Sequence, residues 1–142
     1  MRAIDKYDAQ SLEGTDELRL DFNKLNNVSG VIPVAIQNAE TDEVILVAYT
    51  NKEAFDATVE KRKLILWSSS RQKLWFKGEE SGNTFTVQGI FVNCEQNSLL
   101  YRVTPDRDNI CHTSIDGVPN NCYYRQYDMT TNELIYSPAR TL

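Results

Sequence analysis

The stretch Val31-Ile-Pro-Val-Ala-Ile-Gln37-Asn-Ala-Glu-Thr-Asp-Glu43-Val-Ile-Leu-Val-Ala-Tyr49 is the part of the sequence that decides the fold class. Its two flanks, residues 31–37 and 43–49, are rich in β-branched and aliphatic side chains, which favour strands. The five residues between them are polar and suit the loop of a hairpin. The stretch therefore predicts two antiparallel strands.

The flanking sequence predicts one helix and further strands. Thr50 and Glu53 have the spacing of a capping box, so a helix is expected from Thr50 to about Lys61. Its apolar face would consist of Ala54, Phe55, Thr58 and Val59. Further strands are expected at residues 64–68, 84–94 with a bulge at Gly89, 98–104, 122–127 and 134–136. One helix among several strands indicates a single α+β, mainly β domain over residues 1–142, with a looser N-terminal arm over residues 1–25.

The composition is that of a folded protein that does not bind long polyanions. Of the 142 residues, 41% are hydrophobic and 25% are charged, and the formal net charge is −5. An acidic surface repels nucleic acid and anionic membranes but is compatible with a small phosphorylated ligand. No stretch approaches the roughly 20 apolar residues that cross a bilayer. Residues 1–21 show no apolar core of a secretory signal, so a cytoplasmic location is expected.

The three cysteines, Cys94, Cys111 and Cys122, cannot all pair within one chain. One interpretation is that they are buried small hydrophobes, because free cysteine is among the most buried residue types. The other is a zinc site, since thiolates are preferred zinc ligands. Polar segments flank Cys111 and Cys122, and the only histidine, His112, follows Cys111 directly. Next to a metal ligand, His112 could transfer protons.

Residues 67–83 form an unusual basic and aromatic segment. Both tryptophans lie here, together with Arg71, Lys73, Lys77 and four serines. Arginine suits two-pronged contacts with phosphate, and lysine supplies a point charge. The alternative is an exposed hairpin with tryptophans in the core and a solvated basic edge. Residue types alone leave both interpretations open.

The motifs resemble the phosphoribosyl-AMP cyclohydrolase family of histidine biosynthesis over roughly residues 21–127. The matching motifs are Ile32-Pro-Val-Ala-Ile-Gln37, Leu46-Val-Ala-Tyr-Thr-Asn-Lys-Glu-Ala54, the run from Trp67 to Gly82, a Cys94-centred strand, Cys111-His-Thr113 and Cys122-Tyr-Tyr-Arg125. The resemblance implies an intertwined homodimer with a pseudobarrel-like sheet capped by helices. It also implies contacts with the nucleotide from Trp67, Ser68, Ser70, Arg71, Trp75, Lys77, Glu79 and Ser81.

The resemblance further implies a zinc ion held by Cys94, Cys111 and Cys122, drawn from both subunits. Zinc would activate a water molecule for attack on C6 of an adenine ring that carries phosphoribose on N1, which breaks the N1–C6 bond. His112 would assist the proton transfers. In this interpretation Arg71 and Lys77 bind phosphate, and the tryptophans shape the pocket for the base.

Two departures from the family pattern stand out. The family pattern Asp-Cys-Asp-x-Asp, whose aspartates hold magnesium, reads Asn93-Cys94-Glu95-Gln96-Asn97 here, so Asn93, Glu95 and Asn97 form a degenerate magnesium site. The loss of two carboxylates is expected to weaken magnesium binding severely, which leaves two alternatives: Glu95 holds the ion with help from the substrate, or the site is empty. Ten residues instead of about six separate Cys111 from Cys122, and no basic residue lies in 114–121.

These features predict a zinc-dependent hydrolase that opens the adenine ring of phosphoribosyl-AMP. The departures keep two alternatives open. One is a diverged paralogue that hydrolyses another purine-like or pteridine-like nucleotide. The other is a non-catalytic dimer that binds zinc or a nucleotide.

Overall fold

The structure is a computed structural model that describes residues 17–22, 30–107, 114–115, 118–119 and 121–136. Its elements, in chain order, are β1 (Ile32–Asn38), β2 (Val44–Thr50), α1 (Lys52–Lys61), β3 (Ile65–Ser68), β4 (Lys73–Phe76), β5 (Phe85–Val92), β6 (Leu99–Pro105), β7 (Ser114–Ile115), β8 (Val118–Pro119), β9 (Arg125–Asp128) and β10 (Glu133–Tyr136).

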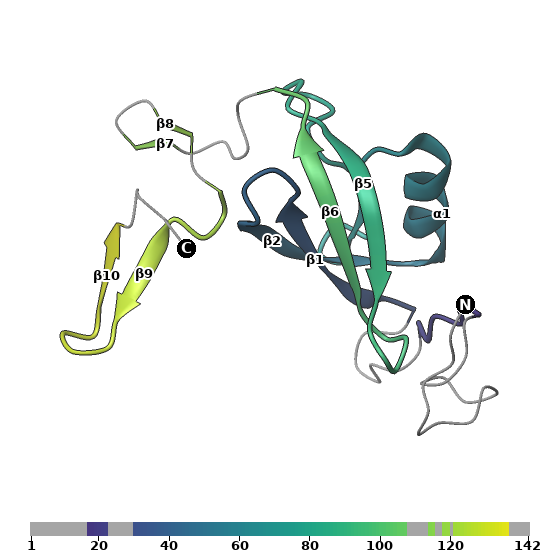
Figure 1. Cartoon of the computed structure of the whole chain (residues 1–142), viewed down its shortest axis with the longest axis horizontal. Helices are drawn as coiled ribbons and strands as arrows, with labels where there is room; N and C mark the ends of the chain where they lie inside the picture. The colour runs from purple at the N-terminus through teal and green to yellow at the C-terminus, as the bar shows by residue number, and fades with distance from the viewer. Residues whose placement is uncertain (1–16, 23–29, 108–113, 116–117, 120, 137–142) are drawn as a thin grey trace.

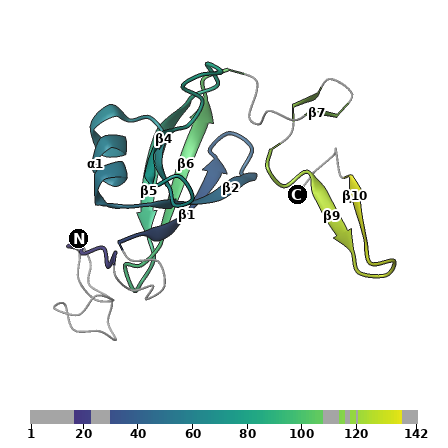
Figure 2. The ribbon, with the colours of Figure 1, turned by 180° about the vertical axis from the view of Figure 1, so that it is seen from behind.

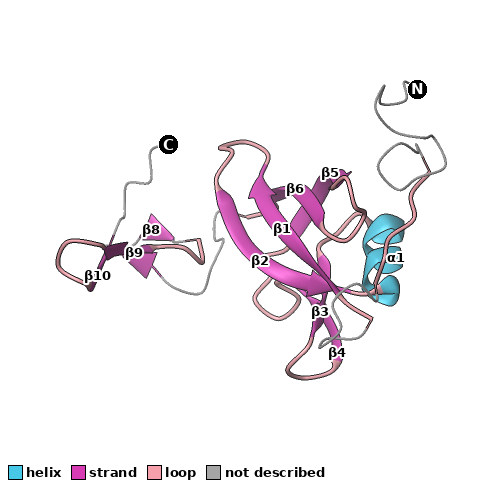
Figure 3. Cartoon of the chain, turned by 90° about the horizontal axis from the view of Figure 1, so that it is seen from below, coloured by secondary structure: helices cyan, strands magenta, loops and turns pink. Residues whose placement is uncertain are grey.

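The main body is a curled six-stranded sheet in the order β4-β3-β2-β1-β6-β5 (Figures 1 and 3). β1 pairs antiparallel with β2, as the opening stretch predicts, and parallel with β6. β5 folds back on β6, and the register shifts between Val87 and Gly89, which confirms the predicted bulge. The α+β, mainly β prediction is therefore confirmed.

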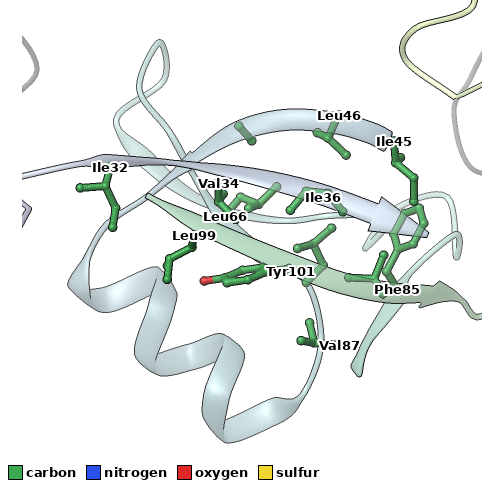
Figure 4. Packing of buried hydrophobic residues seen from close by; sticks show 13 residues of the cluster. Ile32, Val34, Ile36, Ile45, Leu46, Leu66, Phe85, Val87, Leu99 and Tyr101 are labelled. Atoms are coloured by element: carbon green, nitrogen blue, oxygen red, sulfur yellow. The ribbon is translucent and has the colours of Figure 1, made fainter. Parts of the chain in front are cut away.

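The core lies on the concave side of this sheet, where α1 covers it (Figure 4). Alternate residues of β1 are buried, and Ile32, Val34 and Ile36 are fully inaccessible. Each such side chain contributes about 1.5–3 kcal/mol on burial, so β1 anchors the sheet. Tyr101 also lies in the core, and burial raises its pKa to about 12, so its hydroxyl stays neutral at physiological pH.

Helix α1 corrects two details of the sequence-based prediction. The N-cap is Asn51, whose Oδ1 accepts the Ala54 N–H at 2.8 Å, and Thr50 is instead the buried last residue of β2. Asparagine is at least as good a cap as threonine, and here it stands at the first position free of the strand pairing. The apolar face includes Ala54 and Thr58, which are buried, but Val59 is 50% exposed.

Three further differences concern strands. β4 was not predicted, because it is only four residues long, shows no alternation and has basic residues in and beside it. The strand predicted at 122–127 begins at Arg125, since the Cys122 N–H bonds to the Ile45 carbonyl of β2 at 3.1 Å. The short pair β7 and β8 lies in the inserted stretch between Cys111 and Cys122.

The β9–β10 hairpin stands away from the six-stranded sheet in all three ribbon views (Figures 1, 2 and 3). At the other end of the described chain, Leu20 and Phe22 pack against the core. The looser arm over residues 1–25, the helical caps beyond α1 and the homodimer stay predictions. Among the described residues, no helix has both the length and the apolarity to cross a bilayer.

Candidate functional site

The turn between β3 and β4 carries the centre of the basic and aromatic segment. Both the backbone N–H and the Nε of Arg71 lie 3.3 Å from the Ser68 Oγ, and the Ser70 Oγ lies 3.4 Å from that same oxygen. These distances are at the long end of the hydrogen-bond range. Arg71 and Ser70 are exposed. The turn therefore presents a guanidinium and hydroxyls that a ligand can engage with little competition.

A hollow of about 410 Å³ adjoins this turn. Its walls come from β2, from β3 with the following turn, from β4 and from the segment before β9. The lining residues are Leu46, Val47, Ala48, Tyr49, Trp67, Ser68, Ser69, Ser70, Arg71, Trp75, Cys122 and Tyr123. The hollow therefore brings five predicted nucleotide contacts together with one predicted zinc ligand, although Cys122 lies far from the turn in the sequence.

A second hollow of about 300 Å³ shares Arg71 and Trp75 with the first and also takes in Glu79 and Ser81. The Lys77 ammonium lies over the Trp75 ring, 5.4 Å from its centroid. The two hollows and this contact thus account for the positions of all eight predicted nucleotide contacts. Both tryptophans are half-buried, and Trp75 also packs against the core, so the alternative interpretation of an exposed hairpin stays open.

The β3–β4 pairing explains how the tryptophans reach this position. Trp75 lies opposite the buried Leu66 and packs against the core, and Trp67 lies opposite Leu74. Beyond β4, a tight turn carries Glu79 and Ser81. A Cβ atom on Gly78 would lie 2.0 Å from the Asn83 carbonyl oxygen, and its φ is +84°. Only glycine fits there, so Gly78 fixes the path of this turn.

Sequence reasoning missed the apolar and aromatic wall of the larger hollow, which Val47, Tyr49 and Tyr123 provide. Val47 is 55% exposed and Tyr49 is 39% exposed, although both belong to the central strand β2. Alternation along β2 was a usable signal, since Leu46, Ala48 and Thr50 are buried, and the two residues that alternate with them must face outward.

The predicted zinc ligands are only partly described. Cys94 lies in the β5–β6 turn and Cys122 lies before β9, and both are exposed and outside any disulfide. Cys111 and His112 lie outside the described residues. Cys122 lies beside Ile45, near the start of β2, because its N–H bonds to the Ile45 carbonyl. The β5–β6 turn, which carries Cys94, lies towards the opposite end of β2, near Thr50. This follows from the register, since Leu99 after the turn pairs with Val34 of β1, and Val34 pairs with Ala48 of β2.

The two described cysteines of one chain are therefore far apart. Five residues of β2 alone span about 17 Å. Thiolates that share a zinc ion at about 2.3 Å each must lie within about 4 Å of one another. Within the described ranges, no three histidine, cysteine or acidic side chains gather in metal-binding proximity. One copy of the chain thus does not bring Cys94 to Cys122.

The degenerate magnesium residues Asn93, Glu95 and Asn97 lie in the same β5–β6 turn as Cys94. The structure joins them in a network of amide hydrogen bonds, with an Asn93 Nδ2 to Asn97 Oδ1 distance of 2.6 Å.

A separate polar cluster joins the start of β5 to the end of β6, at the end of this hairpin that lies away from Cys94. Lys63 Nζ lies 2.7 Å from the Asp106 carboxylate, and the hydroxyls of Thr84 and Thr86 each donate to it at 2.6 Å. Burial raises the pKa of Asp106, but the hydrogen bonds from Lys63, Thr84 and Thr86 and the lysine charge outweigh burial and lower the pKa below its usual value. We assign this cluster a structural role.

Comparison with known proteins identifies similar sequences. Residues 46–124 match the family model described as phosphoribosyl-AMP cyclohydrolase. A phosphoribosyl-AMP cyclohydrolase of Cenarchaeum symbiosum (strain A) is 40% identical over 108 residues, which cover 76% of this chain and 95% of that protein. One of Nitrosopumilus maritimus (strain SCM1) is 43% identical over 66% of this chain and 83% of its own length. The histidine biosynthesis bifunctional protein HisIE of Bacillus subtilis (strain 168) is 43% identical, and the match spans 46% of it.

Proposed function

Because this chain belongs to the phosphoribosyl-AMP cyclohydrolase family, we propose that it opens the adenine ring of phosphoribosyl-AMP by zinc-dependent hydrolysis in histidine biosynthesis. Water adds its oxygen to C6, the N1–C6 bond breaks, and N1 takes up a proton. The observation that supports this most is the 410 Å³ hollow, in which Cys122 faces the same space as the Ser68–Arg71 turn.

The turn supplies what a phosphorylated ligand needs. The Arg71 guanidinium is positioned for a charge-assisted contact with phosphate, and the hydroxyls of Ser68 and Ser70 add neutral donors. Trp67 and Trp75 offer ring faces and edges for a purine, while Tyr49 closes the apolar wall. In this proposal the turn binds the phosphate and the aromatic wall orients the base.

Cys94, Cys111 and Cys122 are the residues that would hold zinc, and thiolates are a donor set that zinc accepts. When bound, zinc lowers the pKa of a water molecule towards neutrality and supplies the nucleophile. His112 would move the proton to the leaving nitrogen, because its unperturbed pKa lies near physiological pH. Both described thiols are exposed, so they are accessible for coordination.

The distance between Cys94 and Cys122 supports a site shared between two copies of the chain. Two-fold symmetry would bring Cys94 of one copy to Cys111 and Cys122 of the other and would form two such sites per dimer.

The β9–β10 hairpin gives the dimer independent support. Four of its large apolar side chains are exposed to solvent: Tyr127 by 53%, Met129 by 88%, Leu134 by 58% and Ile135 by 43% of their surface. A two-stranded hairpin that stands alone in water is marginally stable at best. The outer face of the main sheet also exposes Phe91, by 53%. We therefore propose that the hairpin covers apolar surface of a second copy, which would produce the intertwined homodimer.

Turnover and metal content, measured on one sample, test this function. Zinc-loaded protein is incubated with phosphoribosyl-AMP, and ring opening is followed by the ultraviolet change of the purine. We expect turnover at one zinc per chain, and loss of both zinc and turnover in Cys122→Ser.

The matched control is Lys52→Ala, which removes an exposed ion pair with Asp56 on α1, away from both hollows. It should retain zinc and turnover. Fully zinc-loaded protein that leaves phosphoribosyl-AMP intact would contradict the proposal, and a screen of other purine-like and pteridine-like nucleotides would then identify a diverged activity.

A further inference from the structure

The turn over residues 93–98 does not fit a magnesium ion. Magnesium requires close to octahedral coordination by oxygen atoms at about 2.0–2.1 Å. The Asn93 Oδ1 is already an acceptor for two backbone N–H groups, those of Asn97 at 2.9 Å and Ser98 at 3.0 Å. An oxygen whose lone pairs point at two N–H groups of its own turn is not available to an ion outside the turn.

The backbone also fixes which way each amide points. If Asn93 were flipped, its NH₂ group would face two backbone N–H donors, so its Nδ2 must point towards Asn97. Asn97 must then present its oxygen to that donor, at 2.6 Å. Its own NH₂ group consequently faces the Glu95 carboxylate, with Nδ2 3.3 Å from Oε2.

The result is a network in which the donors and acceptors of Asn93 and Asn97 match without an ion, and the contact with the Glu95 carboxylate is the longest in it. Three aspartates in these positions would place carboxylates against one another, and like charges at such distances require a cation. Two amides supply the positive ends of N–H dipoles instead. Only Glu95 keeps a formal charge within this trio. The side chains thus do what the ion would do, which is to join residues 93, 95 and 97.

Gln96 holds the same turn from the other side. It is 3% exposed and adopts a left-handed conformation with φ of +56°. Its Nε2 donates to the Glu17 carbonyl at 2.9 Å, and its Oε1 accepts the Arg19 N–H. Its own carbonyl accepts the Asp21 N–H at 2.8 Å. Residues 17–21 are therefore bonded to the turn at every second residue, which fixes the turn that carries Cys94.

We propose that this turn is a metal-free replacement for a magnesium site. The Asn93–Asn97 amide network and the Gln96 contact position Cys94, and the protein requires no magnesium for ligand binding or turnover. The activity part rests on the proposed function, whereas the binding part does not.

Calorimetric titration with magnesium chloride tests the binding part directly. The samples are the zinc-loaded parent, a variant with Asn93→Asp, Glu95→Asp and Asn97→Asp, and the control Asn132→Asp. Asn132 lies in the exposed β9–β10 turn, where aspartate would still accept the Tyr127 hydroxyl. We expect saturable magnesium binding in the triple variant alone. Circular dichroism checks whether each variant is folded. If the triple variant is not folded, the single variant Asn97→Asp is titrated instead.

Saturable binding in the parent that is lost in Asn97→Ala would overturn the proposal, and so would a folded aspartate variant without magnesium binding. Turnover gives a second readout. We expect the parent to change by less than about two-fold when magnesium is added to metal-depleted buffer, whereas the aspartate variant should gain a magnesium requirement. A parent that turns over only with magnesium would refute the proposal. A parent inactive under all conditions would contradict the proposed function and leave the calorimetric result decisive.

Discussion

Two turns of this molecule have similar polar compositions but opposite organisation. In the Ser68–Gln72 turn, the contacts among Ser68, Ser70 and Arg71 are 3.3–3.4 Å long. In the Asn93–Ser98 turn, the contacts of the Asn93 amide are 2.6–3.0 Å long. The first turn adjoins a hollow and keeps its donors available, and the second satisfies its donors internally. Polar composition therefore does not identify a ligand site, because the internal hydrogen bonds decide what remains for a ligand.

The largest effect is expected at the open turn. Arg71→Ala removes the proposed charge-assisted contact with phosphate, which would be worth about 1.5–3 kcal/mol, so KM should rise roughly 10–100-fold. The thermal midpoint should barely change, because Arg71 is exposed. Steady-state kinetics and a melting curve measure the two quantities.

Arg71→Lys is the matched control for that change. Lysine keeps the charge but loses the planar two-pronged geometry, so KM should lie between those of the parent and the alanine variant. A steep fall in melting temperature for Arg71→Ala, with KM unchanged, would mean that the Ser68–Gln72 turn has a structural role, like the Asn93–Ser98 turn, and does not bind phosphate.

The closed turn should respond in the opposite way. Asn93→Ala deprives two backbone N–H groups of their acceptor, which we expect to lower the free energy of unfolding by about 1–2 kcal/mol. KM for the nucleotide should change far less than in Arg71→Ala. Urea denaturation at constant zinc measures the stability. If KM moved more than stability did, the contrast between the turns would be wrong.

The smallest effect is expected at the far end of the β5–β6 hairpin. The pKa of Asp106 is lowered in the folded state, so its contribution is present at neutral pH and is lost as the pH falls below about 4. Asp106→Asn should therefore lower stability by about 1 kcal/mol at pH 7, and the difference from the parent should shrink in acid. Denaturation curves across this pH range test the sign. A difference that grows in acid would show that Asp106 is not stabilised as a carboxylate.

Sequence patterns predicted most of the sheet because β1 and β2 bury alternate or continuous aliphatic residues. They failed where side-chain hydrogen bonds override pattern. The shift of the cap from Thr50 to Asn51 is such a case, because both residues are good caps and only the end of the strand pairing selects one. β4 was missed because Lys73 and Lys77 obscured a strand whose partner, β3, supplies its register.

The candidate site was predictable as a set of residues but not as an arrangement. Residue types and the family motifs predicted the nucleotide segment and Cys122. Their convergence depends on bonds that the sequence does not reveal, including those from the Cys122 N–H to the Ile45 carbonyl and from the Asn121 amide to the Glu43 carboxylate. The network that joins Asn93 to Asn97 could not be predicted either. In the sequence, these positions show only that acidic residues have been lost. The structure shows in addition that the asparagine amides provide N–H donors for neighbouring oxygen atoms of the same turn.

Subunit complementation tests the central claim, that Cys94 of one copy completes a zinc site with Cys111 and Cys122 of another. Cys94→Ser and Cys122→Ser are each expected to lose zinc and turnover. When the two inactive variants are mixed and allowed to exchange subunits, random pairing makes half of the dimers mixed, and each mixed dimer has one intact site. The account predicts recovery of about a quarter of the parent's zinc and turnover in the mixture. A mixture as inactive as its components, with subunit exchange verified by mass spectrometry, would contradict the shared site.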